Sequence, residues 1–197
     1  TDVMLPPPLA HIKSLGYAVF DNPKYDYDLN LFSIRAKPEN SQPNRFDDMT
    51  GCAYLWDGEW RVHYWPSTVD PGFYHLMNPS NTKGTAVLCP GQYRGAYEIG
   101  KHRGQYEALT QVGPVKVWRD PNRDKNVDAW GKVDEGYFGI NIHRASKQES
   151  QQVDKWSAGC TVLKRGADFD SLMDLARKQV TLTGFKSFTY TLLDQWW

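Results

Sequence analysis

Short apolar runs that alternate with polar residues are the feature that most constrains the fold of this chain. Residues 28–36 (DLNLFSIRA) alternate in this way, and the aromatic runs 52–56 and 60–65 flank an Asp-Gly turn. A period of two places every second side chain on one face of a sheet, and Asp-Gly between two such runs is a strong hairpin signal. The pattern predicts a β-rich fold. Further strands are expected at residues 84–88, 96–99, 115–118, 139–143 and 185–193.

One later segment has helical periodicity instead. Residues 168–179 (DFDSLMDLARKQ) place apolar side chains three or four positions apart and end in basic residues, which the helix dipole favours at that end. The chain is therefore expected to be mostly β with one or two helices. Residues 1–24 contain three consecutive prolines and are interpreted as an N-terminal arm or capping segment, and residues 25–197 as one domain.

The charge balance argues against several classes of partner. Lys+Arg and Asp+Glu both number 23, so the formal net charge is zero. Nucleic-acid binding normally needs a basic excess, and no run approaches the roughly 20 apolar residues of a membrane span. We therefore expect neither a nucleic-acid partner nor a membrane span. The chain opens Thr-Asp-Val-Met-Leu-Pro, in which no signal peptide is visible, and its oligomeric state is not predicted.

The three cysteines differ in their surroundings. Cys52 lies in an aromatic strand and Cys89 precedes Pro-Gly, so both are interpreted as structural. Cys160 follows a small, flexible Ser-Ala-Gly turn and lies 17 residues after His143, which ends an expected strand. An imidazole beside a thiol can take its proton and turn it into a nucleophile. Cys160 and His143 are thus the predicted nucleophile and base, and no cysteine spacing indicates a zinc site.

Four further residues are candidates for the substrate and oxyanion region. Gly159 permits a tight turn whose backbone N–H groups can hold an oxyanion, and Ser157 is expected to orient that turn or to contact substrate. His102, in the glycine-bounded segment 100–106, is a candidate groove residue, although a surface-loop histidine is the favoured alternative. Tyr137 precedes the histidine strand and is expected to line the pocket or to pack in the core.

Together the two motifs resemble the catalytic domain of the L,D-transpeptidases (YkuD-like). In that family a histidine ends a strand of the form Gly-Ile-x-Ile-His, and Ser-x-Gly-Cys follows fewer than twenty residues later. This chain has GINIH at 139–143 and SAGC at 157–160. Papain-like and NlpC-type cysteine peptidases have the opposite order. The resemblance extends to the segment 90–99 and to the helix at 168–179, and it implies an L,D-transpeptidase-like β-sandwich.

Two positions depart from the family pattern. Ala158 stands where the family usually has His or Arg, and Val162 where it usually has Arg or Asn. In the family those polar residues help to place the donor peptide. The departures therefore concern how a substrate is held and whether transpeptidation occurs, whereas the nucleophile and the base are unchanged.

The resemblance implies acyl transfer on the stem peptides of peptidoglycan, at an L-to-D linkage and with no required cofactor. Endolysin-like cleavage by water is favoured, because no export signal is visible and segments 100–106 and 119–124 are similar to a branch associated with bacteriophage lytic proteins. Such a protein would act on the bacterial cell wall as a phage-encoded lysis protein or a virion component. The alternatives are a cross-linking L,D-transpeptidase and a non-catalytic wall-binding or virion structural protein with the same fold.

A possible calcium loop is a separate feature. Asp120, Asn122 and Asp124 begin a series of oxygen-bearing side chains at alternate positions. The segment lacks the glycine at the sixth position of a calcium loop, and Gly131 stands where an acidic residue is needed. A solvated turn is therefore favoured over a calcium site.

Overall fold

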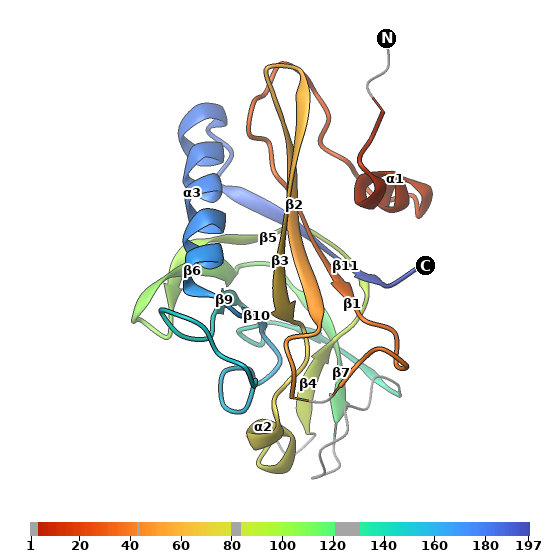
Figure 1. Cartoon of the computed structure of the whole chain (residues 1–197), viewed down its shortest axis with the longest axis vertical. Helices are drawn as coiled ribbons and strands as arrows, with labels where there is room; N and C mark the ends of the chain where they lie inside the picture. Colours follow the sequence, from red (N-terminus) through yellow and green to blue (C-terminus); the bar gives the residue numbers. More distant parts are fainter. Residues whose placement is uncertain (1–3, 43, 80–83, 121–130) are drawn as a thin grey trace.

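The computed structural model describes residues 4–42, 44–79, 84–120 and 131–197 and shows a mostly β molecule (Figure 1). The predicted mostly β class is confirmed; one or two helices were expected, and the described residues form three, two of them short. The helices are α1 (Pro7–Ser14), α2 (Phe73–Met77) and α3 (Gly166–Thr183). The strands are β1 (Asn30–Arg35), β2 (Asp48–Trp56), β3 (Glu59–Thr68), β4 (Thr85–Leu88), β5 (Gly91–His102), β6 (Tyr106–Gln111), β7 (Val115–Asp120), β8 (Val133–Gly136), β9 (Ile142–Arg144), β10 (Thr161–Leu163) and β11 (Ser187–Asp194).

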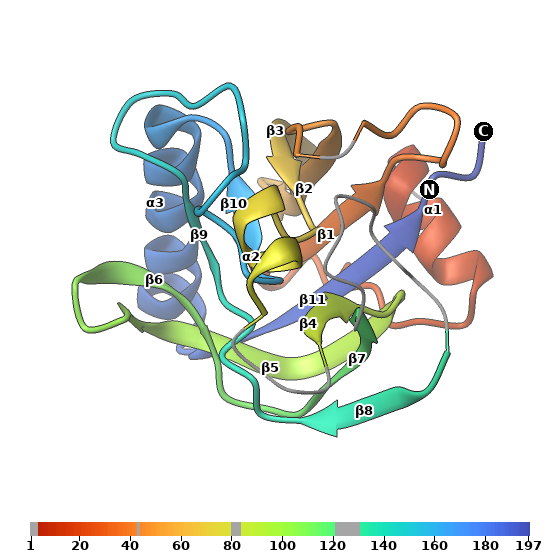
Figure 2. The ribbon, with the colours of Figure 1, turned by 90° about the horizontal axis from the view of Figure 1, so that it is seen from below.

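Within the described residues, eight strands close into a barrel and three form a second sheet. The barrel order is β1-β11-β5-β6-β9-β10-β3-β2, and the small sheet has the order β4-β7-β8. Two barrel pairs, β1 with β11 and β9 with β10, are parallel. In Figures 1 and 2, α3 and α1 lie on opposite sides of the barrel. The finer expectation, an L,D-transpeptidase-like sandwich, stays a prediction.

The β2–β3 hairpin forms where the Asp-Gly signal predicts it. Trp56 pairs with Glu59, so the loop contains only Asp57 and Gly58. Both have positive φ, 52° and 75°, as a type I′ turn requires. Asp tolerates this conformation and Gly adopts it at little cost, so these two residues set the register of the hairpin.

Several element boundaries differ from the prediction. The strand expected at 139–143 begins only at Ile142, because Gly139 has a φ of 66° and interrupts the extended backbone. Strand β5 is far longer than the expected 96–99. Strands β6, β8 and β10 were not predicted, since their segments are very short or polar, and neither were the short helices α1 and α2. The predicted late helix is confirmed and is extended at both ends as α3.

Two fully buried tyrosines connect the barrel interior to Ile140 and Thr161, which lie next to the candidate site. Their rings meet edge to face at 5.5 Å between centroids. The hydroxyl of Tyr97 donates to the carbonyl oxygen of Ile140 at 2.8 Å, and the hydroxyl of Tyr190 lies 2.8 Å from the Thr161 Oγ1. Buried hydroxyls need such partners, so the core fixes the positions of Ile140 and Thr161.

The N-terminal arm packs against the outside of the barrel. Helix α1 begins at Pro7, a favoured first residue, and buries Leu9 and Ile12 against apolar side chains of β1 and β11. The His11 ring stacks on Trp196 at 4.1 Å, so the last residues fold back onto the arm. Within the described residues, no helix combines the length and apolar character needed to cross a membrane.

A Leu9→Ala substitution tests whether the arm is part of the cooperative fold. Leu9 is fully buried, so its truncation should lower the free energy of unfolding by about 2–5 kcal/mol. Leu15, which is 50% exposed, is the matched control, and Leu15→Ala should cost less than about 0.5 kcal/mol. Urea denaturation measures both. Equal, small losses would show that the arm does not pack as described.

Candidate active site

Parallel pairing of β9 and β10 brings the two predicted catalytic residues side by side, because His143 lies in β9 and Cys160 directly precedes β10. Val162 is in register with His143, and the Thr161 N–H donates to the Asn141 carbonyl at 3.0 Å. Side chains on a strand alternate between the two faces. On one face, Ile142 packs in the main core of the barrel and Thr161 contacts the buried Tyr190. On the other face, Cys160 and Val162 pack together in a separate apolar cluster. Continuing the register sets Cys160 beside Asn141, with His143 one step along the same face.

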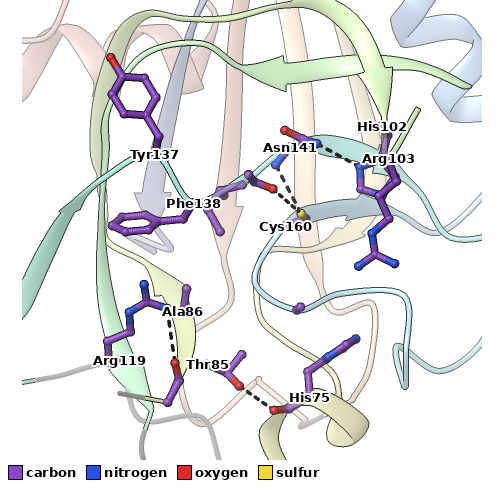
Figure 3. Close-up of a pocket in the computed structure, with 14 residues that line it drawn as sticks. His75, Thr85, Ala86, His102, Arg103, Arg119, Tyr137, Phe138, Asn141 and Cys160 are labelled. Atoms are coloured by element: carbon purple, nitrogen blue, oxygen red, sulfur yellow. Dashed lines mark hydrogen bonds between the residues drawn. The ribbon is translucent and has the colours of Figure 1, made fainter. Parts of the chain in front are cut away.

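The Cys160 thiol opens onto a cavity of about 570 Å³. Its Sγ accepts a hydrogen bond from the Asn141 N–H and donates one to the Gly139 carbonyl, both at 3.3 Å (Figure 3). Burial raises the pKa of this thiol to about 11, against the smaller lowering effects of the Asn141 N–H and the Arg103 charge. The resting thiol is therefore protonated at neutral pH, which fits its role as a donor to Gly139.

Hydrogen bonds occupy one ring nitrogen of His143, Nδ1. Its Nδ1 donates to the Arg144 carbonyl at 2.8 Å, and the Tyr106 hydroxyl lies 3.2 Å from the same nitrogen. A proton on Nδ1 leaves Nε2 as the basic nitrogen. Burial lowers the pKa of His143 to about 3, with help from His102 and nearby arginines, so the ring is neutral at neutral pH. Among the described residues, no hydrogen bond joins His143 directly to Cys160.

His102 lies at the end of β5, and its surface-loop interpretation is wrong. It is 7% exposed, and its ring stacks on that of His143 with centroids 3.9 Å apart. The Asn141 Nδ2 donates to its Nδ1 at 3.1 Å, which links His102 to the residue beside Cys160. Burial lowers the pKa of His102 to about 4, so the two stacked rings do not repel each other as cations. His102 also lines the cavity.

The turn before Cys160 is tied together internally. The Ser157 Oγ donates to the Cys160 carbonyl at 2.9 Å and accepts the Gly159 N–H at 3.1 Å. Ser157 is fully buried, so of its two predicted roles it fills the first and orients the turn. The Gly159 N–H is thereby occupied, contrary to its expected part in an oxyanion hole. Gly159 has a φ of 120°, and a Cβ there would lie 2.5 Å from the Ala86 carbonyl oxygen.

Aromatic and cationic side chains form the rest of the cavity wall. Tyr137 lines it at the rim and is 69% exposed, so the alternative of core packing does not hold. Phe138 lies deeper, with the Arg119 guanidinium 4.8 Å above its ring. Arg103 and His75 complete the polar part of the wall.

Sequence reasoning missed several residues of this site. Asn141 was within the histidine motif, and its position two residues before His143 was a usable signal, because alternate strand positions share a face. Arg103 and Arg119 come from the β5–β6 turn and β7, and Tyr106 from β6, so only the folded structure brings the two arginines to the cavity and Tyr106 to His143.

The described residues hold no group of three or more His, Cys, Asp or Glu side chains arranged for a metal ion. Asp120 is buried at the end of β7. Asn122 and Asp124 lie outside the described residues, so the calcium interpretation of that segment stays an untested alternative.

No family model, curated protein or solved structure matches this chain. The L,D-transpeptidase resemblance is therefore carried by the two motifs at 139–143 and 157–160 and their flanks.

A Gly159→Ala substitution tests the close approach of the turn to β4. The positive φ of residue 159 disfavours alanine, and the added Cβ would clash with the Ala86 carbonyl oxygen. Together these two effects should lower the free energy of unfolding by about 2–6 kcal/mol. Gly58→Ala is the matched control, because Gly58 also has a positive φ but open space around its Cα. That control should cost about 1–2 kcal/mol. Thermal or urea unfolding measures both variants. If Gly159→Ala and Gly58→Ala lowered the free energy of unfolding equally, the close approach of the turn to β4 would be contradicted.

The pH dependence of alkylation tests the state of the thiol. Only the thiolate reacts with iodoacetamide, so below the raised pKa of Cys160 the rate should climb about tenfold per pH unit. We expect this increase in rate from pH 7 to 10. Cys160 should be alkylated faster than the fully buried Cys52, because burial raises the pKa of Cys52 even further. Mass mapping of alkylated peptides gives the rates. A plateau beginning below pH 8 would mean that the resting site holds a thiolate.

Proposed function

We propose that this protein is a cysteine-dependent acyl-transfer enzyme that cleaves stem peptides of peptidoglycan. The observation that carries the proposal is the Cys160 thiol at a cavity of about 570 Å³, directly before a strand that pairs with the strand of His143, whose Nδ1 is fixed. Cavities of this size are typical of sites that enclose small ligands or peptide segments. A purely structural cysteine requires neither the cavity nor the oriented imidazole.

The proposed reaction begins with a peptide carbonyl bound over Cys160. The thiol leaves the Gly139 carbonyl, His143 Nε2 takes its proton, and Sγ bonds to the carbonyl carbon. The backbone N–H of Cys160 is the proposed oxyanion donor. As the intermediate collapses, the C–N bond breaks and the departing amine receives the proton from His143. Water then attacks the thioester with His143 as base, which releases a carboxylic acid and restores the thiol.

The shifted pKa values bear on the timing of proton transfer. Burial disfavours both the Cys160 thiolate and the His143 imidazolium, so a resting ion pair is not expected. We infer that the proton moves as sulfur attacks, when the two charges form together and attract each other. Tyr106 and the Arg144 carbonyl support this step by keeping the proton of the neutral ring on Nδ1.

Cleavage is preferred to cross-linking for this site. Ala158 lines the cavity without a polar side chain, and Val162 is buried, so neither supplies the donor-placing group of the resembled family. The proposed place of action is the bacterial cell wall, for a phage-encoded lysis protein or a virion component. Cross-linked products would instead indicate a transpeptidase, and a complete lack of turnover would indicate a non-catalytic wall-binding or virion protein.

Substitution of Cys160 tests the function. Cys160→Ala should abolish release of soluble stem-peptide fragments from purified peptidoglycan, and His143→Ala should slow it by about 10²–10⁴-fold, the usual contribution of a general base. Cys89→Ala, which removes another buried thiol away from the cavity, is the control and should retain full activity. Mass spectrometry of the fragments separates hydrolysis from cross-linking. Continued release by Cys160→Ala would overturn the proposal.

A further inference from the structure

The oxyanion region of the candidate site lacks one donor that its turn sequence predicts. The Ser157 hydroxyl accepts the Gly159 N–H at 3.1 Å, which leaves the backbone N–H of Cys160 as the donor to an oxyanion. Oxyanion holes commonly combine two donors, because the oxygen of a tetrahedral intermediate carries a full negative charge. A second donor would have to reach the same cavity from another element of the fold.

His102 reaches this cavity from the end of β5 and is connected to the sulfur through Asn141. The Asn141 backbone N–H donates to the Cys160 Sγ at 3.3 Å, and the Asn141 Nδ2 donates to His102 Nδ1 at 3.1 Å (Figure 3). Cys160 and His102 both line the cavity. One residue, Asn141, therefore positions the imidazole of His102 relative to the reacting sulfur.

Hydrogen bonds around Asn141 fix which nitrogen of His102 carries the proton. The backbone N–H of Gln111 can only donate, and it lies 3.0 Å from Asn141 Oδ1, so this oxygen is the acceptor. The amide group of Asn141 is thereby oriented with its Nδ2 toward His102, and the His102 Nδ1 must accept. A neutral imidazole that accepts at Nδ1 has its proton on Nε2.

The Nε2–H of His102 is left for a ligand. In the part of the chain that the structure describes, this nitrogen has no hydrogen-bond partner and is not among the fully buried polar atoms that lack one. Because His102 lines the cavity, the N–H opens onto it. Burial and the charge of Arg103 lower the pKa of His102 to about 4, so at neutral pH the ring is neutral and holds this single proton.

The two stacked histidines are therefore suited to different tasks. His143 has its proton on Nδ1 and a basic Nε2, whereas His102 accepts at Nδ1 and donates at Nε2. With both nitrogens committed in this way, neutral His102 is a hydrogen-bond donor to the cavity and not a base. A neutral histidine that donates to a developing negative charge is a known means of polarising a carbonyl group.

We propose that His102 is a catalytic residue whose Nε2–H donates to the oxyanion formed when Cys160 attacks a carbonyl group. This inference rests on the proposed function. As Sγ bonds to the carbonyl carbon, one electron pair of the C=O bond moves to the oxygen, which accepts hydrogen bonds from His102 Nε2 and the Cys160 N–H. His102 keeps its proton throughout. The pair returns to the C–O bond as the C–N bond breaks, and the proton that His143 took from the thiol goes to the departing amine.

A comparison of two reactions of the Cys160 thiol tests this role separately from peptide cleavage. Acylation by p-nitrophenyl acetate passes through a tetrahedral oxyanion, whereas alkylation by iodoacetamide does not. His102→Phe retains an aromatic ring against His143 but has no N–H, so it should slow acylation by about 10²–10³-fold, the usual effect of losing one oxyanion donor. Its alkylation rate should stay within about threefold of that of the unsubstituted protein, because that rate follows the thiolate. His102→Gln, whose amide can donate near the same position, should recover part of the acylation rate.

His63→Phe is the matched control. His63 also stacks against aromatic neighbours, Tyr54 and Trp65, but it is not among the described residues that line the cavity, so both rates should be unchanged. Mass mapping of modified Cys160 peptides gives the two rates. Equal slowing of both reactions by His102→Phe, or acylation that His102→Phe leaves unchanged, would overturn the inference. If the unsubstituted protein releases no fragments from peptidoglycan, the proposed function is contradicted instead, and the two rates still decide the role of His102.

Discussion

The parallel pairing of β9 and β10 is the constraint on which the candidate site depends. It aligns Asn141 with Cys160 and sets His143 one step further along the same face, while Ile142 and Thr161 turn inward. Inside the barrel, the hydroxyls of two buried tyrosines contact the carbonyl of residue 140 and the side chain of Thr161. The outer face can therefore carry polar, reactive groups because the inner face is fixed by core packing and satisfied hydrogen bonds.

Burial gives this site a neutral resting state. The thiol of Cys160 and the ring of His143 both have pKa values shifted away from their charged forms, and His102 stacks on His143 without a charge of its own. A protonated thiol bound to the Gly139 carbonyl is protected from adventitious reaction. Charge develops only when a carbonyl is in place to receive the sulfur, which ties reactivity to substrate binding.

Local sequence signals predicted the parts of the structure that local interactions determine. The Asp57-Gly58 turn identified the β2–β3 hairpin, and the spacing of apolar residues identified α3. The motifs around His143 and Cys160 likewise marked two segments that the structure brings together. The hairpin and the helix are each decided within one element or across a two-residue turn, whereas residues 145–160 separate β9 from β10 and the pairing of the two motif segments is visible only in the structure.

The remaining features depend on contacts between distant segments. His102 was a candidate groove residue, but its stacking on His143 could not be predicted, because it follows from the barrel order β5-β6-β9-β10. The same order brings Tyr106 to the imidazole. The Gly159 N–H was expected to face a substrate, yet the Ser157 hydroxyl, two residues away, accepts it. Turn composition alone does not distinguish these two partners.

Trapping the acyl-enzyme tests directly whether Cys160 is the nucleophile. The protein is mixed with a stem tetrapeptide, quenched in acid within the first turnover, and its intact mass is measured. If Cys160 is the nucleophile, the mass should increase by the acyl part of the peptide, peptide mapping should locate this group as a thioester on Cys160, and His143→Ala should greatly reduce it. Turnover of the peptide with no adduct, or an adduct on any other residue, would contradict the claim that Cys160 is the nucleophile.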